Sequence, residues 1–280
     1  MKKKFAALSA GLLTAALALS GCSNAADSGS SSPSESAAAS EAAAADTDAV
    51  TLYVVRHGKT MLNTTDRVQG WADAPLTPAG VEVVEAAGRG LADVEFQSAY
   101  SSTSGRAYET ADLILKESEK SSDLTIIQDE RLREFNFGTY EGDLNHTMWQ
   151  HIADDKGVTL EEFLANVDPK EFADTVAKLD KARPEAEGNW PAEDYDTIVA
   201  RLDAGIKDIV EAETAKGDGN VLIVSHGLSI MAMLKHLFGD DMPEASGVKN
   251  ASVTIIEYKD GEFELKSFND ESYIEKGQKK

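Results

Sequence analysis

The sequence predicts an α/β fold in which helices cover both faces of a mostly parallel sheet. Two apolar runs, Leu52–Val55 and Asn220–Val224, are typical of buried strands, and each leads into a histidine followed by glycine (His57-Gly58 and His226-Gly227). Predicted strands alternate with amphipathic helices, the order that builds a three-layer α/β/α sheet. Ligands of such sheets bind beyond the carboxyl ends of the strands, so both histidines are expected at one binding edge.

The first 48 residues are predicted to lie outside this fold. Residues 1–21 combine a basic head with a short apolar stretch, which is typical of a secretory signal. The ending Leu19-Ser20-Gly21-Cys22 resembles a bacterial lipoprotein signal. This resemblance implies an acylated Cys22 and an extracytoplasmic protein anchored to the bacterial cell membrane. Residues 22–48 are mostly Ser, Ala, Asp and Glu, a composition that predicts a disordered tether.

The charge of the chain excludes some partners. The 49 Asp and Glu outnumber the 27 Lys and Arg, for a formal net charge of −22, and loss of the leader would remove three further lysines. Such a chain is not expected to bind nucleic acid or to adhere to anionic membrane surfaces. A phosphorylated substrate would therefore need positive charge concentrated locally. Cys22 is the only cysteine, which excludes an intrachain disulfide.

The elements between the two histidines follow from capping signals and periodicity. Thr77-Pro78 begins a helix that runs to about Ala92, with threonine as N-cap and proline at the first helical position. A strand at Gln97–Ser101, a helix at about 106–117 and a strand at Leu124–Ile127 are expected next. Residues of about 143–201 are acidic and mostly helical in pattern, which predicts an inserted helical lobe.

After the second histidine, the sequence predicts a helix and a β-hairpin. The helix spans Leu228–Phe238, and the hairpin strands Ser252–Tyr258 and Glu262–Ser267 turn at Asp260-Gly261. The last strand is expected to be antiparallel, at an edge of the sheet. The domain is thus predicted to span residues 49–270, with residues 271–280 as a C-terminal tail.

Five blocks of this domain resemble the histidine phosphatase superfamily, in its phosphoglycerate-mutase-like branch. They occur in the order of that family and extend over nearly the whole domain. The blocks are Arg56-His57-Gly58 with Asn63, residues 67–77, residues 101–111, residues 132–142 and Ser225-His226-Gly227. The resemblance implies a phosphoglycerate mutase-like fold and chemistry on phosphate esters without a metal or another cofactor.

The resemblance also implies a role for individual residues. His57 would be the nucleophile that forms a phosphohistidine, and Glu134 would be the proton donor. His226 would be catalytic as well and would bind the phosphate together with Arg56, Asn63 and Arg106. Gln69 and Gly70 would bind the rest of the substrate. These residue types suit the chemistry, because a phosphoryl group spreads charge over three oxygens and arginine never deprotonates and donates bidentate hydrogen bonds.

Other polar and aromatic residues have two interpretations. Glu193 is a reserve proton donor, although pairing at a helix N-terminus is the favoured interpretation. His146 and His151 lie near acidic residues but lack a complete metal-ligand spacing, so surface positions on a helix are favoured. Trp149 and Trp190 either line a substrate mouth or pack the insertion.

The function expected is hydrolysis of a small phosphorylated substrate, with an optimum on the acidic side of neutrality. The alternatives are a phosphoglycerate-type mutase and a non-catalytic lipoprotein that binds a phosphorylated ligand. Mutases of this superfamily have paired arginines after the acid, whereas this chain continues acidic after Gly142. Lys59, Leu62 and Glu109 depart from the family pattern, so the natural substrate stays open, as does the oligomeric state.

Overall fold

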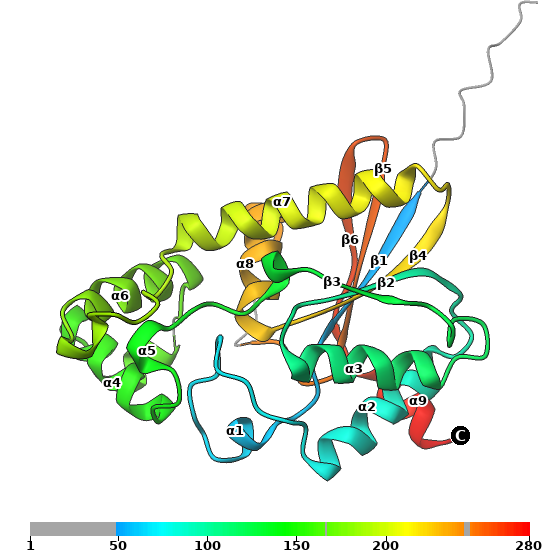
Figure 1. The fold of residues 1–280 in the computed structure, drawn as a ribbon. Coiled ribbons are helices and arrows are strands. Elements are labelled where there is room, and N and C mark those ends of the chain that lie inside the picture. The colour runs from blue at the N-terminus through cyan, green and yellow to red at the C-terminus, as the bar shows by residue number, and fades with distance from the viewer. Residues whose placement is uncertain (1–48, 166, 244–246) are drawn as a thin grey trace, which may run out of the picture. The chain divides into compact units, whose positions relative to one another are not determined.

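A six-stranded mixed sheet forms the centre of the fold (Figure 1). The structure is a computed structural model that describes residues 49–165, 167–243 and 247–280, so the predicted signal, Cys22 and the tether lie outside the described residues. The strand order is β3-β2-β4-β1-β5-β6. The strands are β1 (Val50–Arg56), β2 (Phe96–Ser101), β3 (Ile126–Gln128), β4 (Gly219–Ser225), β5 (Val253–Lys259) and β6 (Glu262–Asp270).

The pairing of the strands brings the two histidine segments together. Strands β3, β2, β4 and β1 are parallel, β5 is antiparallel to β1, and β6 is antiparallel to β5. The predicted mostly parallel sheet with an antiparallel edge strand is thereby confirmed. Strands β1 and β4 are direct neighbours, with Arg56 opposite Ser225. Because the next residue in each chain segment is a histidine, His57 and His226 leave the sheet at the same place.

Helices cover both faces of the sheet: α2, α3 and α9 pack on one face and α7 and α8 on the other (Figure 1). None of the helices in the described ranges is both long and apolar enough to cross a membrane. The helices are α1 (Met61–Thr64), α2 (Pro78–Leu91), α3 (Gly105–Lys116), α4 (Asn145–Lys156), α5 (Leu160–Ala165), α6 (Pro169–Lys181), α7 (Tyr195–Thr214), α8 (Gly227–Phe238) and α9 (Ser272–Gln278). Short 3-10 turns occur at Glu130–Leu132, Gly138–Tyr140, Pro184–Ala186 and Gly239–Asp241.

The apolar side chains of β4 contribute to two hydrophobic cores, one on each face of the sheet. In β4, Val221 and Ile223 belong to the core under α7 and α8, whereas Leu222 and Val224 belong to the core under α2 and α3. Successive side chains of a strand point to opposite faces, so a strand covered on both sides has no polar face. This is why the apolar run before Ser225 predicted a buried strand correctly.

The helical insertion expected at about 143–201 is present as α4, α5, α6 and the first turns of α7. Its buried side chains, among them Met148, Ile152, Phe163 and Phe172, belong to the same core as α7 and α8. The insertion is therefore continuous with the sheet domain, on the side of the sheet where α8 begins at His226.

Some boundaries differ from the prediction; β6, for example, continues three residues past Ser267 to Asp270. Strand β3 begins at Ile126, because the N–H of Leu124 donates to the Ser121 carbonyl in a turn (3.1 Å). Residues 271–280, expected as a tail, contain helix α9, which packs on α2. A Cβ at Gly277 would overlap the Ala86 carbonyl oxygen, so glycine allows the two backbones to touch. Seven residues are too few for a periodic pattern to predict this helix.

The predicted hairpin is present, and β5 and β6 are joined at Asp260 and Gly261. Both turn residues have positive φ angles, 56° and 88°. A two-residue hairpin loop of this kind requires positive φ at both central positions, which explains the Asp-Gly sequence.

Candidate active site

His57 and His226 meet at the carboxyl edge of the sheet. Their ring centroids are 5.1 Å apart, and the two side chains are 3% and 0% exposed. The N–H of His57 donates to the Ser225 carbonyl at 3.0 Å, which extends the pairing of β1 with β4 to the histidine itself. Arg56 lies against Gly227, where a Cβ would be 3.3 Å from the arginine Nε. The two segments that the sequence singles out therefore form one site.

His57 is held in a single tautomer. Its Nδ1 lies 2.8 Å from the Gly58 carbonyl oxygen, which can only accept, so Nδ1 bears the proton and Nε2 presents a lone pair. Burial, followed by the charges of Arg106 and Arg56, holds the pKa of His57 well below its usual value. The imidazole is therefore neutral at neutral pH, the form in which histidine is a nucleophile.

Arg106 is fully buried and fixes His226. Its Nη2 donates to the Gly70 carbonyl at 2.7 Å and to Nδ1 of His226 at 2.9 Å. Since arginine cannot accept, Nδ1 of His226 is the acceptor, and its Nε2–H donates to Ser102 Oγ at 2.6 Å. Nη1 of Arg106 donates to Asp73 at 2.9 Å. Burial, with Arg106 next in effect, holds the pKa of His226 well below its usual value, so both imidazoles are neutral.

Three nitrogen donors around the histidines are buried and have no hydrogen-bond partner. They are Arg56 Nε, Arg106 Nε and Gln69 Nε2; the other such side-chain atoms in the described residues are hydroxyl oxygens of Ser118, Thr214 and Ser267. A buried N–H without an acceptor destabilises a fold by about 1–3 kcal/mol. Three such donors at one edge indicate that a ligand rich in acceptor atoms completes them.

Two of these residues, Arg56 and Gln69, line a cavity of about 400 Å³, whose polar end also includes Asn63 and Glu134. The side-chain oxygen of Asn63 accepts from the N–H of Thr60 at 3.2 Å, in a capping box at the start of α1. The short helix α1 thereby fixes Asn63 at the wall of the cavity. Arg56, Asn63 and Gln69, which the sequence predicts as ligand-binding residues, thus lie together.

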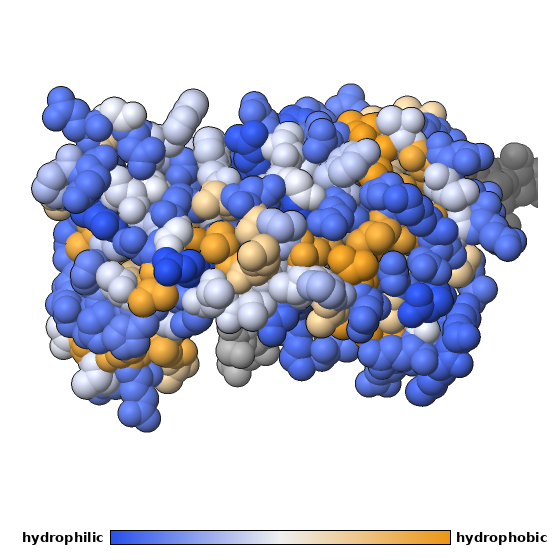
Figure 2. Space-filling view, turned by 60° about the horizontal axis from the view of Figure 1, so that its bottom comes forward, coloured by the Kyte–Doolittle hydropathy of each residue, from blue (hydrophilic) through white to orange (hydrophobic). Residues whose placement is uncertain are grey.

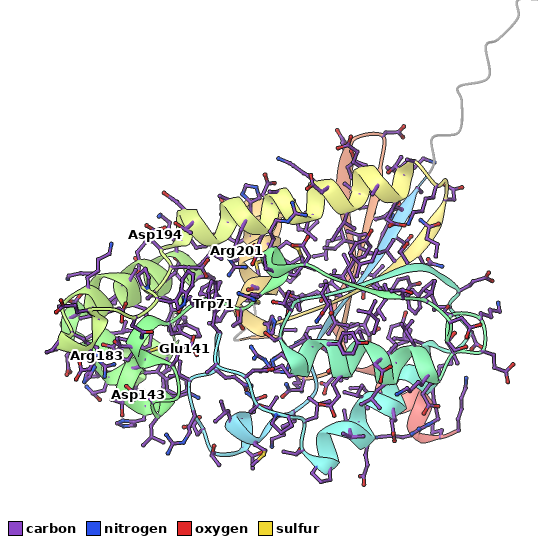
Figure 3. The ribbon with its side chains drawn as sticks, in the orientation of Figure 1. Trp71, Glu141, Asp143, Arg183, Asp194 and Arg201 are labelled. Carbon is purple, nitrogen blue, oxygen red and sulfur yellow. The ribbon has the colours of Figure 1, made fainter. Side chains whose placement is uncertain are left out.

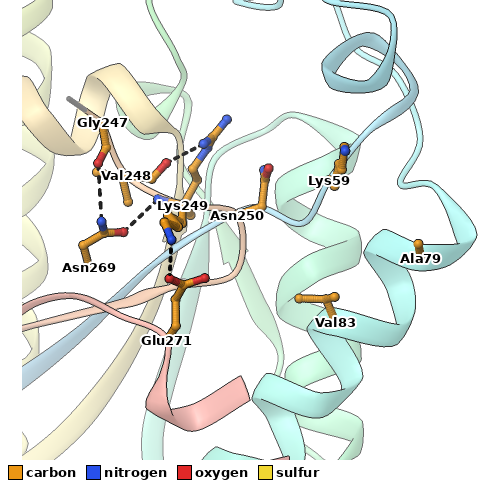
Figure 4. Close-up of a pocket in the computed structure, with 10 residues that line it drawn as sticks. Lys59, Ala79, Val83, Gly247, Val248, Lys249, Asn250, Asn269 and Glu271 are labelled. Atoms are coloured by element: carbon orange, nitrogen blue, oxygen red, sulfur yellow. Dashed lines mark hydrogen bonds and ion pairs between the residues drawn. The ribbon is translucent and has the colours of Figure 1, made fainter. Parts of the chain in front are cut away.

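A larger recess of about 730 Å³ shares Arg56 but lies between α2 and the end of β6 (Figure 4). Lys249 in this recess pairs with Glu271 at 2.7 Å. Neither histidine lines either space, but Asn63, Gln69 and Glu134 line only the smaller cavity. We therefore place the chemistry in the smaller cavity, although the recess is the larger of the two.

Glu134 lies at the N-terminus of α8. Its carboxylate accepts hydrogen bonds from the N–H groups of Leu228 (3.1 Å) and Ser229 (2.9 Å) and from the Ser229 hydroxyl (3.0 Å). Because His226 is the N-cap of the same helix, these bonds fix the carboxylate close to the histidine pair. The residue predicted as proton donor is therefore buried in the wall of the cavity.

Glu193, the reserve proton donor, lies in an ion pair instead. Both its carboxylate oxygens accept from Arg201, at 2.8 and 2.9 Å, and it is not among the residues that line the 400 Å³ cavity. Arg201 also donates to the carbonyls of Arg131, Arg133 and Glu134 at 2.7–2.9 Å. The pair thus holds the segment that presents Glu134 against α7 (Figure 3).

Glu141 orients the backbone of residues 70–72 at the site, although the sequence pattern assigned it no role. Its carboxylate accepts from the three N–H groups of residues 70–72 at 2.8–3.0 Å (Figure 3). This turns the Gly70 carbonyl toward Arg106. Gly70, predicted to bind substrate, therefore has both its N–H and its carbonyl engaged within the protein, whereas Gln69 keeps an unpartnered amide nitrogen.

The remaining residues with two interpretations now have positions. Trp149 lines the 400 Å³ cavity, whereas Trp190 contacts Trp71 (ring centroids 5.6 Å apart) and is 70% exposed. His151 contacts the Tyr140 hydroxyl at 3.1 Å. Within the described ranges, no group of three His, Cys, Asp or Glu side chains is arranged to hold a metal ion.

Two neutral imidazoles, one fully buried and one half-buried guanidinium group, and a carboxylate at the edge of an α/β sheet define a site for phosphate esters. The chain belongs to the histidine phosphatase superfamily (branch 1), whose family model matches residues 52–171 and 157–271. The chain is thus an enzyme of this superfamily, as the sequence predicts.

Similar proteins include both phosphatases and mutases. The crystal structure of phosphoglycerate mutase from Bacillus anthracis str. Sterne is 44% identical, with a TM-score of 0.76 over 83% of this chain and 98% of that one. The 2,3-bisphosphoglycerate-dependent phosphoglycerate mutase of Cytophaga hutchinsonii is 30% identical over 186 residues, 66% of this chain and 76% of that protein. Fructose-2,6-bisphosphatase TIGAR B of Danio rerio is 30% identical over 207 residues, 68% of this chain and 75% of that protein.

Proposed function

We propose that the chain hydrolyses small phosphomonoesters through a phosphohistidine on His57, with Glu134 as the proton donor. The observation that supports this most is the neutral His57 ring, whose Nε2 keeps a lone pair, at an edge of the sheet where the buried Nε–H groups of Arg56 and Arg106 have no acceptor. The lone pair supplies the nucleophile. The donors supply fixed positive charge for the phosphoryl oxygens as charge develops on them.

In the first step, Nε2 of His57 attacks phosphorus and the bond to the ester oxygen breaks. Arg56 and Arg106 hold the phosphoryl oxygens. Nδ1 of His57 keeps its proton, which it donates in a hydrogen bond to the Gly58 carbonyl. The departing alkoxide takes a proton from Glu134 and leaves as the alcohol. The products of this step are a phosphohistidine and an ionised Glu134.

In the second step, water attacks the phosphohistidine. The Glu134 carboxylate takes a proton from this water as the bond between nitrogen and phosphorus breaks. Inorganic phosphate leaves, and His57 and Glu134 return to their starting states. The two steps together convert ester and water into alcohol and phosphate.

A phosphomutase is the second candidate, because two of the similar proteins are named phosphoglycerate mutases. A mutase must hold a second anionic group while it returns the phosphoryl group. Beyond Arg56, the residues that line the cavity include one further arginine, Arg67, and no lysine. Arg67 donates to the Gly142 carbonyl at 2.7 Å. This scarcity of cations favours water as the acceptor.

The proposal is tested by incubating the purified full-length protein with p-nitrophenyl phosphate. We expect steady release of phosphate and, after rapid quenching, an acid-labile, base-stable phosphate on the enzyme. Faster transfer of the phosphoryl group to 3-phosphoglycerate than to water would identify a mutase. Phosphate binding without turnover would identify a non-catalytic binding protein.

The pH profile of kcat/KM tests the proton donor. Since the pKa of His57 lies well below its usual value, the nucleophile stays neutral as the pH falls through the range where histidine ordinarily gains its proton. Glu134 must carry a proton in order to donate one, so kcat/KM is expected to be higher in acidic than in alkaline solution. A kcat/KM that rises steadily toward alkaline pH would exclude Glu134 as the donor.

The variant Glu134→Gln separates proton donation from phosphate binding. It is expected to lower kcat/KM by about 10²–10⁴-fold for alkyl phosphates, whose alkoxide cannot leave without a proton. The loss should be much smaller for p-nitrophenyl phosphate, whose phenolate leaves unaided. Equal losses with both substrates would show that Glu134 acts through structure alone.

The protein is further proposed to be extracytoplasmic, attached to the bacterial cell membrane through an acylated Cys22. The support is the sequence of residues 1–22, with its basic head, its apolar stretch and the ending Leu19-Ser20-Gly21-Cys22. Metabolic labelling with palmitate should modify the wild-type protein and not Cys22→Ala. An unlabelled wild-type protein would contradict the anchor.

A further inference from the structure

The cavity that begins at the phosphate donors continues into an apolar chamber. Beyond its polar end, its lining side chains are mostly aliphatic and aromatic, and half of these come from α4, α5 and α6. They include Phe137, Met148, Trp149, Phe163, Leu164 and Phe172. The helical insertion therefore forms one wall of the active site.

This wall is part of the hydrophobic core. Met148, Phe163 and Phe172 are 3–5% exposed and belong to the core under α7 and α8. The rings of Phe163 and Phe172 stack with an interplanar angle of 11°, and Phe137 meets Phe172 edge to face. Close packing of this kind gives the chamber a fixed shape.

The rim of the chamber is apolar as well. Leu164 and Val167 line it and are 42% and 41% exposed. The face of the molecule in Figure 2 shows apolar side chains interrupting a mostly hydrophilic surface. Single exposed aliphatic residues are common, but a pair at the mouth of an apolar chamber is placed to cover an apolar ligand.

Two polar side chains among the lining residues are partly engaged with other protein groups. Arg67 donates to the Gly142 carbonyl, and the amide nitrogen of Asn145 donates to Asp66 at 2.8 Å. The aliphatic and aromatic side chains of the wall offer few partners to the hydroxyl groups of a sugar, and burying those groups unpaired is unfavourable. An apolar group has no hydrogen bonds with water to lose, and its transfer out of water is favourable in free energy.

We propose that the natural substrate is the phosphomonoester of an apolar alcohol, with an aliphatic chain of about eight carbons in the chamber. This substrate class rests on the proposed hydrolase function. At about 30 Å³ for each small group, 400 Å³ holds roughly a dozen non-hydrogen atoms. A phosphate group takes about five of these places, which leaves the remainder for the chain.

The test is a series of n-alkyl phosphates, from ethyl to dodecyl, assayed below their critical micelle concentrations with the purified full-length protein. Transfer of each methylene from water should raise kcat/KM by about fourfold, up to a chain of about eight carbons, after which the gain should stop. Glucose 6-phosphate and 3-phosphoglycerate are expected to react no better than ethyl phosphate.

A variant at the rim gives an independent measurement. Leu164→Asp should lower the ratio of kcat/KM for octyl phosphate to that for ethyl phosphate by about tenfold, because a charge replaces apolar surface at the mouth. The matched control is Val158→Asp, since Val158 is 37% exposed in the same insertion and is not among the lining residues. It should leave the ratio unchanged.

The outcomes separate the two proposals. A flat response to chain length, or a Leu164→Asp ratio equal to that of Val158→Asp, would overturn the apolar substrate while p-nitrophenyl phosphate is still hydrolysed. Release of phosphate from none of the esters, p-nitrophenyl phosphate included, would overturn the hydrolase function itself.

Discussion

His57→Ala is expected to abolish hydrolysis of p-nitrophenyl phosphate, with a loss of about 10⁴–10⁶-fold in kcat. The substitution removes the nitrogen that receives the phosphoryl group, and the imidazole of His226 has no free nitrogen to replace it. Both ring nitrogens of His226 are engaged, one by Arg106 and one by Ser102. Affinity for inorganic phosphate, measured by calorimetry, should change little, because the guanidinium donors remain.

The matched control for this variant is His146→Ala. His146 is an exposed residue of α4 that does not line the cavity, and its loss should leave kcat within about twofold, as surface substitutions generally do. Base-stable phosphate trapped on the His57→Ala protein would show that another histidine is the nucleophile, and the mechanism would then need a different first step.

The place of the two histidines could be predicted because it depends on strand polarity. Each follows an apolar run, and the carboxyl ends of parallel strands lie along one edge of a sheet. The direct pairing of β1 with β4, with Val50 opposite Gly219, depends on strand order. Strand order is a tertiary property, so neither local pattern contains it. The repeated strand-histidine-glycine pattern placed both histidines at one edge, and the strand order makes them direct neighbours.

The residues that orient the site could not be predicted in the same way. Glu141 accepts from three backbone N–H groups of residues 70–72, and Asp73 accepts from the Gly105 N–H and from Arg106. Carboxylates in loops usually indicate solvent-exposed charge. Their role here depends on backbone groups about 30 to 70 positions away, which no periodic pattern encodes. The one signal in the sequence was the glycine at position 70. The structure explains it, because a side chain there would overlap Phe135 and Glu141.

Arg106→Lys should lower kcat/KM by about 10²–10³-fold, although it preserves the charge. The guanidinium has five N–H donors, and four are used within the protein: two by the carbonyls of Ala72 and Gly70, one by Asp73 and one by His226. The fifth, Nε, is buried and unpartnered, which leaves it for the phosphate. Lysine has three donors on one nitrogen and cannot reach all of these groups.

The substitution should also release His226 from its fixed tautomer, because Nδ1 loses the donor that makes it an acceptor. Nitrogen chemical shifts of the imidazole would report this change separately from activity, and thermal unfolding would confirm that the variant folds. Arg89→Lys on α2 is the matched control: Arg89 is 34% exposed, pairs with Glu117 and should leave kcat/KM within about twofold. Near-normal activity of Arg106→Lys would mean that Arg56 holds the phosphate without Arg106. The buried guanidinium would then serve only to join residues 70–73 to the sheet.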